Sequence, residues 1–448
     1  MSTHAAPWSR TAALLQSHCR PKTARNIGIE IERIGLWEDG YSLHYRHHPD
    51  GRPGAEQMLM ALGQQLGWPV VTYSEASPLG LSGPQGKVSL EPGSQLEFSA
   101  NPMASVRATA KIVAGFENEV EKVTSRYGLH WVGLGLNPFA RVEDLDVIPL
   151  TRYRLMTDFF GRHGTLGTTM MRLTSSIQIN FDYSNEIEAI SMLRASLALA
   201  PLSTALFGNS PFSAGGKNGW KSFRSEVWRQ MDPARSGLMP EAFEDGFNFE
   251  NYAELAWKRP LMFVQNTEGR NVASADRTLQ EIALGQLEGC ELNDENEMTC
   301  LRQLFTEARL KPGYVEVRSI DGLRLADRYP CVAFWTGVIY SEAARNLALD
   351  RLGSLTPKLR NELWVAAGRE GLHASIGGIS MQSLALEMLE AARKSLVHRG
   401  LGEENYLVSL EQDIRQGKNP ADKVLELYDG PAKQNLAAIV RYCAERSA

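Results

Sequence analysis

The chain has 448 residues, of which 43% are hydrophobic and 22% charged, a balance typical of a packed globular protein rather than a disordered or fibrous one. Its 52 acidic residues outnumber 47 basic ones, and no run of Lys or Arg resembles a nucleic-acid-binding stripe, so we expect no nucleic-acid partner. No apolar run is long enough to cross a bilayer and the amino terminus lacks the features of a secretory signal, so we expect no membrane association and a cytoplasmic location.

The first two thirds of the chain mix strands and helices, which predicts an α+β fold with helices packed on a sheet. Strands are predicted where apolar residues alternate, and helices where they recur at helical spacing. The predicted strands cover residues 27–36, 87–99, 171–183 and 314–320, and the predicted helices cover residues 55–66, 103–127 and 186–207.

Beyond about residue 340 the pattern is helical throughout. We therefore predict an α+β sheet region over residues 1–340, which carries the functional site, and a helical carboxy-terminal region over residues 341–448 within the same domain. Its predicted helices cover residues 342–352, 358–368, 383–398, 420–428 and 435–446.

The five cysteines include no CxxC pair and no zinc-type grouping with histidine. Free thiols in a reducing compartment are therefore expected, with a disulfide between Cys290 and Cys300 as the open alternative. No HExxH or GxSxG motif occurs either, which removes the simplest zinc and serine hydrolase sites.

Several predicted strands carry two polar residues that face the same way. Residues two apart in a strand share a face, so Glu30 and Glu32 project together, opposite to Ile29 and Ile31. A solvated sheet face explains one such pair well. Here the arrangement recurs with acids and amides, and Glu91 adds another acid before a Pro-Gly turn. The pairs are Glu30 with Glu32, Gln95 with Glu97, Gln178 with Asn180, and Glu316 with Arg318.

Clustered carboxylates repel one another unless they are protonated or neutralised by a cation. Mg²⁺ binds carboxylate oxygens and takes further ligands from substrate phosphates, so these strands predict a metal-lined sheet that seats ATP without a GxxxxGK[ST] phosphate loop. Arg172, Arg224 and Arg318 are candidates to hold phosphate or carboxylate groups. On periodicity alone, a surface ion pair is the simpler explanation for Arg172 and Arg224.

Short motifs follow one another in a fixed order along nearly the whole chain. They are GIEIERIG from Gly28, SLEPGSQLEFS from Ser89, GLGLNP from Gly133, MM at Met170 leading to QINFD from Gln178, ALFGNSPF from Ala205, FRSEVW from Phe223, DPARSG from Asp232, FEDGF from Phe243 and VEVR from Val315. As an ordered set they resemble the plant and proteobacterial branch of the glutamate–cysteine ligases.

The resemblance implies a fold like that of glutamine synthetase, with a curved, mostly antiparallel sheet and helices outside it. It also implies that ATP phosphorylates the γ-carboxylate of glutamate before an amine displaces the phosphate. By position, Arg224 and Arg318 would stabilise phosphoryl charge or hold the glutamate α-carboxylate. Further substrate contacts are predicted for Gln95, Arg172, Asn180 and Trp228. The implied Mg²⁺ ligands are Glu30, Glu32, Glu91, Glu97, Gln178 and Glu316.

We therefore predict an ATP- and Mg²⁺-dependent γ-glutamyl ligase that joins L-glutamate to L-cysteine through a γ-glutamyl phosphate, as a monomer or homodimer. The chain departs from the family pattern where Arg172 precedes Leu173 and Ser175 replaces an expected cysteine. An arginine moved by one position on a strand would face the opposite side. A different amine or amino-acid acceptor therefore stays open, and a non-catalytic nucleotide-binding paralogue is the remaining alternative.

Overall fold

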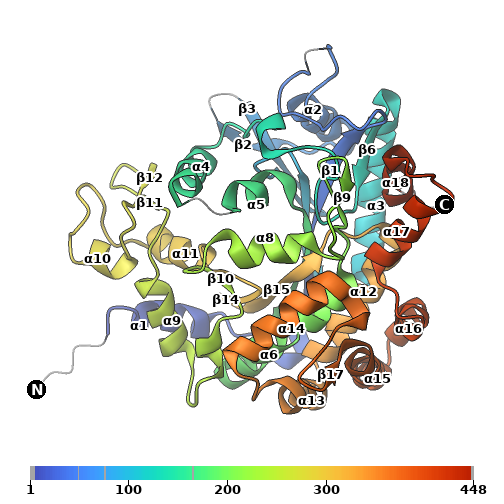
Figure 1. The fold of residues 1–448 in the computed structure, drawn as a ribbon. Helices are drawn as coiled ribbons and strands as arrows, with labels where there is room; N and C mark the ends of the chain where they lie inside the picture. Colours follow the sequence, from blue (N-terminus) through green and yellow to red (C-terminus); the bar gives the residue numbers. More distant parts are fainter. Residues whose placement is uncertain (1–5, 49, 75–76, 164–165, 445–448) are drawn as a thin grey trace, which may run out of the picture.

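A nine-stranded antiparallel sheet forms the centre of the protein (Figure 1), in a computed structural model that describes residues 6–48, 50–74, 77–163 and 166–444. Along the sheet the strand order is β14-β15-β7-β1-β5-β4-β3-β2, and β6 pairs with the far end of β1. The strands are β1 (Ile27–Trp37), β2 (Val70–Ser74), β3 (Ser77–Gly83), β4 (Gly86–Leu90), β5 (Leu96–Met103), β6 (Leu129–Val132), β7 (Ser176–Asp182), β14 (Ala308–Lys311) and β15 (Tyr314–Asp321).

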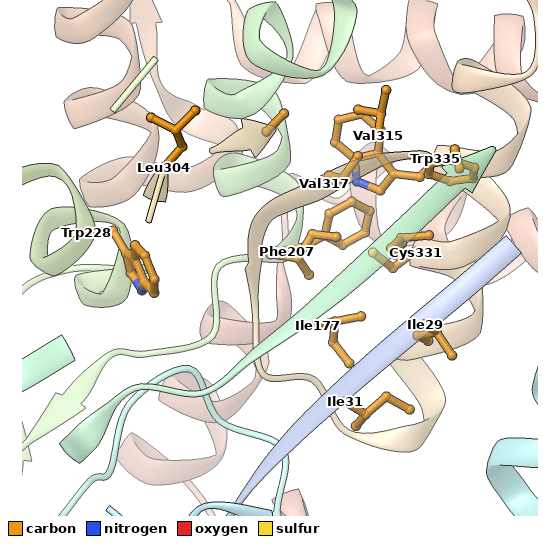
Figure 2. Packing of buried hydrophobic residues seen from close by; sticks show 14 of the residues in the cluster. Ile29, Ile31, Ile177, Phe207, Trp228, Leu304, Val315, Val317, Cys331 and Trp335 are labelled. Carbon is orange, nitrogen blue, oxygen red and sulfur yellow. The ribbon is translucent and has the colours of Figure 1, made fainter. Parts of the chain in front are cut away.

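The sheet has one apolar face, which packs against helices. Ile29, Ile31 and Ile177 are buried there, and Figure 2 shows them beside Cys331 and Trp335 of the helix α12 (Leu325–Ile339). Because side chains alternate along a strand, burying these isoleucines turns the intervening residues of β1 and β7 to the opposite face. That opposite face carries the polar pairs singled out in the sequence.

The predicted strand over residues 87–99 is two strands, β4 and β5, joined by a tight turn. Within the turn the Glu91 amide donates to the Gln95 carbonyl at 2.9 Å, and Ser94 adopts a φ of 67°. Gly93 is required by a close approach, because a side chain there would collide with the carbonyl oxygen of Arg172. The turn thus brings Glu91 and Gln95 close to the segment that precedes β7.

The three predicted helices before residue 340 are present, but the sequence did not predict the other helices of this region. The expected helix over residues 186–207 is two helices that meet at a 52° bend, where Pro201 lies in the first turn of the second. Within the described residues, no single helix is both long and apolar enough to cross a membrane, and this bent pair meets the test only when its halves are combined. The main helices are α1 (Ser9–Ser17), α2 (Ala55–Leu66), α3 (Val106–Thr124), α4 (Thr151–His163), α5 (Gly167–Leu173), α6 (Glu186–Ala198), α7 (Ala200–Phe207), α8 (Phe223–Met231), α9 (Phe249–Lys258), α10 (Leu279–Ala283) and α11 (Asp294–Arg302).

One predicted strand is partly wrong. Residues 171–173 belong to the helix α5, and the strand β7 begins only at Ser176. Met170, Met171 and Leu173 are all buried, so packing against α4 and α8 favours a helix over a short alternating pattern.

The carboxy-terminal region is helical, as predicted, and packs on the sheet region. The helix α15 packs against α12, and α14 packs against α7. The sequence did not predict α16, and the division at residue 340 stays a prediction. All five cysteines are free thiols, as expected. The helices are α13 (Glu342–Leu352), α14 (Pro357–Glu370), α15 (Met381–Arg399), α16 (Leu407–Arg415), α17 (Pro420–Asp429) and α18 (Leu436–Cys443).

Candidate active site

The polar face of the sheet forms the floor of a cavity of about 340 Å³. Strands β1, β5, β7, β14 and β15 supply the floor, and the turn between β4 and β5 together with helices α4, α5, α8 and α11 surrounds it. Four glutamates line one end of the floor and are called the acidic cluster. They are Glu30, Glu32, Glu91 and Glu97.

The register of the sheet brings the acidic cluster together. Glu32 on β1 lies directly opposite Glu97 on β5, and Glu30 lies opposite Gln178 on β7. Side chains opposite each other on adjacent strands are close neighbours, so residues far apart in sequence meet on one surface. Glu97 also accepts a 2.5 Å hydrogen bond from the Ser89 hydroxyl on β4.

Burial and mutual repulsion make these carboxylates hard to ionise. Burial raises the pKa of Glu97 to about 8, with the charges of Glu91 and Glu32 adding to the effect. Burial and the charges of Glu316 and Glu97 raise the pKa of Glu30 to about 8. The pKa of Glu91 is raised to about 7, again mainly by burial, and burial also raises the pKa of Glu32. The acidic cluster therefore favours a bound cation near neutral pH.

The acidic cluster fits a metal ion that takes ligands from elsewhere. Within the described parts of the chain, no group of three or more carboxylate, histidine or cysteine side chains is placed to hold a metal ion. The charge of Glu97 nevertheless raises the pKa of Glu30, and the charge of Glu91 raises the pKa of Glu97, so the three carboxylates lie near one another. Oxygen donors arranged in this way suit Mg²⁺, which commonly uses one or two carboxylates together with water and phosphate oxygens.

Three cations occupy the opposite end of the floor, on β14 and β15. They are called the basic cluster and consist of Arg309, Lys311 and Arg318. Arg309 donates two hydrogen bonds to the carboxylate of Glu316, at 3.0 and 2.8 Å, and Arg318 forms an ion pair with the same carboxylate. The cavity thus has an acidic end and a basic end, separated by β7.

Glu316 does not have the geometry predicted for a metal ligand. Its side chain is buried, it does not line the cavity, and its two oxygens are occupied by arginines. Burial alone would raise its pKa, but the charges of Arg309 and Arg318 hold it well below its usual range. The alternating sequence correctly placed Glu316 on the polar face but could not show that neighbouring arginines neutralise it.

Gln178, predicted as a Mg²⁺ ligand, lines the cavity between the two ends, whereas Asn180, predicted as a substrate contact, does not line it. Gln178 donates to Glu32 at 2.9 Å and accepts from Arg318 at 2.6 Å, so its amide links the acidic and basic clusters. Asn180 donates to Glu30 at 2.8 Å. Both amides orient a carboxylate of the acidic cluster.

Arg224 lies behind the cavity wall and not at its surface. It is buried, it donates to the backbone carbonyl of Arg318 at 3.1 Å, and it lies 3.9 Å from Asp321. The ring of Trp228, which does line the cavity, covers Arg224 at 5.3 Å and Arg318 at 5.1 Å. Such cation–π contacts fix both guanidinium groups.

Two predicted substrate contacts are structural in this fold. Arg172 lies on α5 and donates to the carbonyls of Val142 and Leu145 at 2.9 and 3.1 Å, outside the cavity lining. Gln95 borders the cavity, but its side-chain amide donates to Thr174 at 2.8 Å and accepts from Gly93 at 2.8 Å. Both side chains stabilise the turn and helix that form the wall.

Sequence reasoning missed several residues of the cavity. Arg152 and Tyr153 begin α4, and the Tyr153 hydroxyl lies 3.4 Å from both oxygens of Glu91. Arg309 and Lys311 lie on β14, a strand of four residues. Alternation over so short a segment gives no usable strand signal, although the spacing of these two cations matches that of Glu316 and Arg318.

Comparison with known proteins identifies the family. Residues 42–442 match the model of the glutamate–cysteine ligase family 2. The chain is 32% identical over 430 residues to the chloroplastic glutamate–cysteine ligase of Arabidopsis thaliana, covering 95% of this chain and 80% of the relative. It is also 32% identical over 428 residues to the chloroplastic enzyme of Medicago truncatula, covering 94% of this chain and 82% of that one.

Solved structures agree on the fold. Glutamate–cysteine ligase from Francisella tularensis, solved in complex with AMP, aligns with a TM-score of 0.55 at 14% identity, covering 94% of this chain and 88% of that chain. A bifunctional glutathione synthetase from Pasteurella multocida aligns with a TM-score of 0.55 at 14% identity, covering 97% of this chain and 53% of the other. These alignments and the antiparallel sheet confirm the predicted fold class.

The comparisons correct one prediction and confirm another. The curated relatives are named as chloroplastic proteins, so the predicted cytoplasmic location is wrong. Its basis, the lack of a secretory signal, tests only for export. The predicted family is confirmed by a model match across most of the chain and by relatives above 30% identity. The chain belongs to the glutamate–cysteine ligase family 2.

Proposed function

We propose that this ligase joins the γ-carboxylate of L-glutamate to the amino group of L-cysteine, with ATP as phosphoryl donor and Mg²⁺ as cofactor. The observation that carries the proposal is the division of one cavity into an acidic end and a basic end. A metal–triphosphate complex needs carboxylate oxygens, and amino-acid carboxylates need cations.

The acidic cluster is the proposed Mg²⁺ site. When bound, Mg²⁺ would neutralise phosphate charge and hold ATP in line with the glutamate γ-carboxylate. Gln178 donates to Glu32 and Asn180 donates to Glu30, so both amides fix the orientation of the proposed ligands. Glu316 is not included, because arginines already occupy its oxygens.

Arg318 is the proposed stabiliser of phosphoryl charge. Its guanidinium lines the cavity, hydrogen bonds to Gln178 at 2.6 Å and is covered by Trp228. A fixed, preorganised cation stabilises the charge that develops during transfer without reorganising. Arg224 lies behind Arg318 and acts through it, by donating to its carbonyl oxygen and adding positive potential.

The proposed reaction has two steps, the phosphorylation of glutamate and the attack by cysteine. The glutamate γ-carboxylate oxygen attacks the terminal phosphorus of ATP, and ADP leaves. The cysteine amine then attacks the γ-carbonyl carbon of γ-glutamyl phosphate and phosphate leaves, with the surplus amine proton released to a base or to water. The site supplies positioning and electrostatics rather than a protein nucleophile.

The two altered residues that suggested another amine acceptor have structural roles in this fold. Ser175, the residue at the altered position, is buried and donates to the Leu134 carbonyl at 2.6 Å. Arg172 holds backbone carbonyls. Neither residue lines the cavity, so neither selects the amine. The presence of the whole acidic cluster also speaks against a non-catalytic paralogue.

A coupled assay of ADP formation tests the proposal. Purified protein with ATP, Mg²⁺, L-glutamate and one amine from a panel should form ADP fastest with L-cysteine, and mass spectrometry should detect γ-glutamylcysteine. Chelation of Mg²⁺ should stop the reaction. Faster ADP formation with another amine, or a rate that does not depend on cysteine, would contradict the proposal.

A further inference from the structure

Lys311 is a buried cation without a hydrogen-bonding partner in the described structure. It ends β14, lines the cavity and is only 9% exposed. The nearest carboxylate oxygen recorded for its ammonium group belongs to Glu316, at 4.0 Å, which is beyond hydrogen-bonding distance. The ammonium group is not sealed in the interior, so an anionic ligand that enters the cavity can accept its hydrogen bonds.

The other cations that line the cavity all have acceptors. Arg309 is held by Glu316, Arg318 by Gln178 and Glu316, Arg302 by Glu295 at 2.6 Å, and Arg152 by the Tyr153 hydroxyl at 3.2 Å. Glu316 forms only a 4.0 Å ion pair with Lys311, while Arg309 donates to both of its oxygens and Arg318 to one of them. Among the cavity cations of the described chain, only Lys311 has no hydrogen-bond acceptor.

The position of Lys311 separates its ligand from the metal-bound phosphates. The strands β15, β7 and β1 lie between β14 and β5, so four strand spacings of about 4.8 Å put Lys311 and Glu97 roughly 19 Å apart at the backbone. A lysine side chain extends over about 6 Å, so the ammonium group does not reach Glu97, although Glu30 of the acidic cluster is near enough for its charge to act on Lys311. An anion without a metal ion of its own fits this end.

We propose that Lys311 binds the α-carboxylate of an amino-acid substrate in this cavity. The inference rests on the proposed function and adds a substrate-binding residue to it. Glutamate and cysteine both carry an α-carboxylate that takes no part in bond formation, and an ammonium group is a suitable partner for either one. Thr299 on α11 and Gln303 just after it also line the cavity.

Removing the carboxylate from the substrate and the ammonium from the protein tests this contact. 4-Aminobutanoate is glutamate without its α-carboxylate, and cysteamine is cysteine without its carboxylate. Wild type, Lys311→Met and Lys311→Arg are assayed with each natural substrate and its analogue, as kcat/KM or as an inhibition constant where an analogue is not turned over. Lys87→Met is the matched control, since Lys87 is an exposed lysine on β4 of the same sheet.

In one of the two substrate pairs, Lys311→Met should lower kcat/KM for the natural substrate by roughly 10- to 100-fold and leave the analogue within about twofold. That pair identifies which carboxylate Lys311 binds. Lys311→Arg should retain most of the preference, and Lys87→Met all of it. Equal losses for substrate and analogue in both pairs, a change in the KM for ATP alone, or no change would overturn the inference.

The same experiment distinguishes failure of the inference from failure of the proposed function. Wild-type protein that makes no product from glutamate, cysteine and ATP would overturn the proposed function. Calorimetric binding of glutamate, cysteine and their analogues would then test Lys311 without turnover, with the same selective loss expected. If Lys311→Met does not fold, Lys311→Gln and Lys311→Arg are used instead. The inference then requires that Lys311→Gln loses the preference for the substrate with the carboxylate and that Lys311→Arg keeps it.

Discussion

Glu32 on β1 and Glu97 on β5 face each other directly across the sheet, although both side chains are acids. Like charges at such positions destabilise a sheet, and burial makes the repulsion worse. Stability alone would favour a neutral residue at one of the two positions. The pair is understandable as a cation site whose function opposes stability.

Replacing Glu97 by Gln should therefore separate activity from stability. We expect kcat/KM to fall by at least about 100-fold, because a proposed metal ligand is lost, while the melting temperature of the metal-free protein stays equal or rises. Steady-state kinetics and a thermal melt measure the two effects. Glu268→Gln, at an exposed acid, is the control and should change neither. Undiminished turnover in Glu97→Gln would remove Glu97 from the site.

The pH dependence of stability should follow from the raised pKa values. The pKa is raised to about 8 for Glu30 and Glu97 and to about 7 for Glu91, whereas an unfolded glutamate titrates near about 4.3. Between these values the folded protein holds more protons than the unfolded chain, so the free energy of unfolding should decrease as pH rises from about 5 to about 8. Thermal melts without metal should show this decline.

Addition of Mg²⁺ with ATP should reverse that decline, because ligands that bind only the folded state stabilise it and a cation favours ionised carboxylates. We expect the increase in melting temperature to be larger at about pH 8 than at about pH 5. In Glu97→Gln the decline with pH should be shallower. A melting temperature that rises with pH in the metal-free wild type would contradict the assigned burial of the acidic cluster.

The sequence predicted the polar residues on the sheet floor better than the residues that surround and pair with them. Alternation identified the polar faces of β1, β7 and β15 because the opposite positions, such as Ile29 and Ile177, are consistently apolar. It could not identify β14, which is too short, or the wall residues Arg152 and Tyr153, whose positions depend on how α4 packs. The assigned role of Glu316 failed for the same reason, since pairing with Arg309 is a tertiary contact between neighbouring strands.

Loss of the Glu316 carboxylate should strongly destabilise the folded protein, and this effect should dominate any effect on metal binding. Glu316→Ala leaves Arg309 and Arg318 buried without their shared carboxylate, and breaking a buried pair of this kind typically costs about 3–5 kcal/mol. We expect a markedly lower denaturant midpoint, with Glu316→Gln intermediate because it can still accept hydrogen bonds. Wild-type stability combined with a marked rise in the Mg²⁺ concentration needed for half-maximal activity would instead restore Glu316 as a metal ligand.

Arg172 should matter for stability and not for substrate affinity. In Arg172→Met the carbonyls of Val142 and Leu145 lose a charged donor, which typically costs about 1.5–3 kcal/mol. The KM values for glutamate, cysteine and ATP should stay within about twofold of wild type. Chemical denaturation and steady-state kinetics check the two expectations. A tenfold rise in any one KM without loss of stability would return Arg172 to the substrate contacts.

Trp228 should contribute to stability through its ring and to binding through its N–H. The ring covers two buried guanidinium groups, while the indole nitrogen is buried at the cavity with no recorded hydrogen bond. Trp228→Leu removes both features, whereas Trp228→Phe keeps an aromatic face, so Phe should restore most of the melting temperature that Leu loses. The KM for one substrate should stay raised by roughly tenfold in both variants, because neither can donate. Full recovery of affinity in Trp228→Phe would mean that the ring alone is used and that the indole nitrogen contacts no substrate.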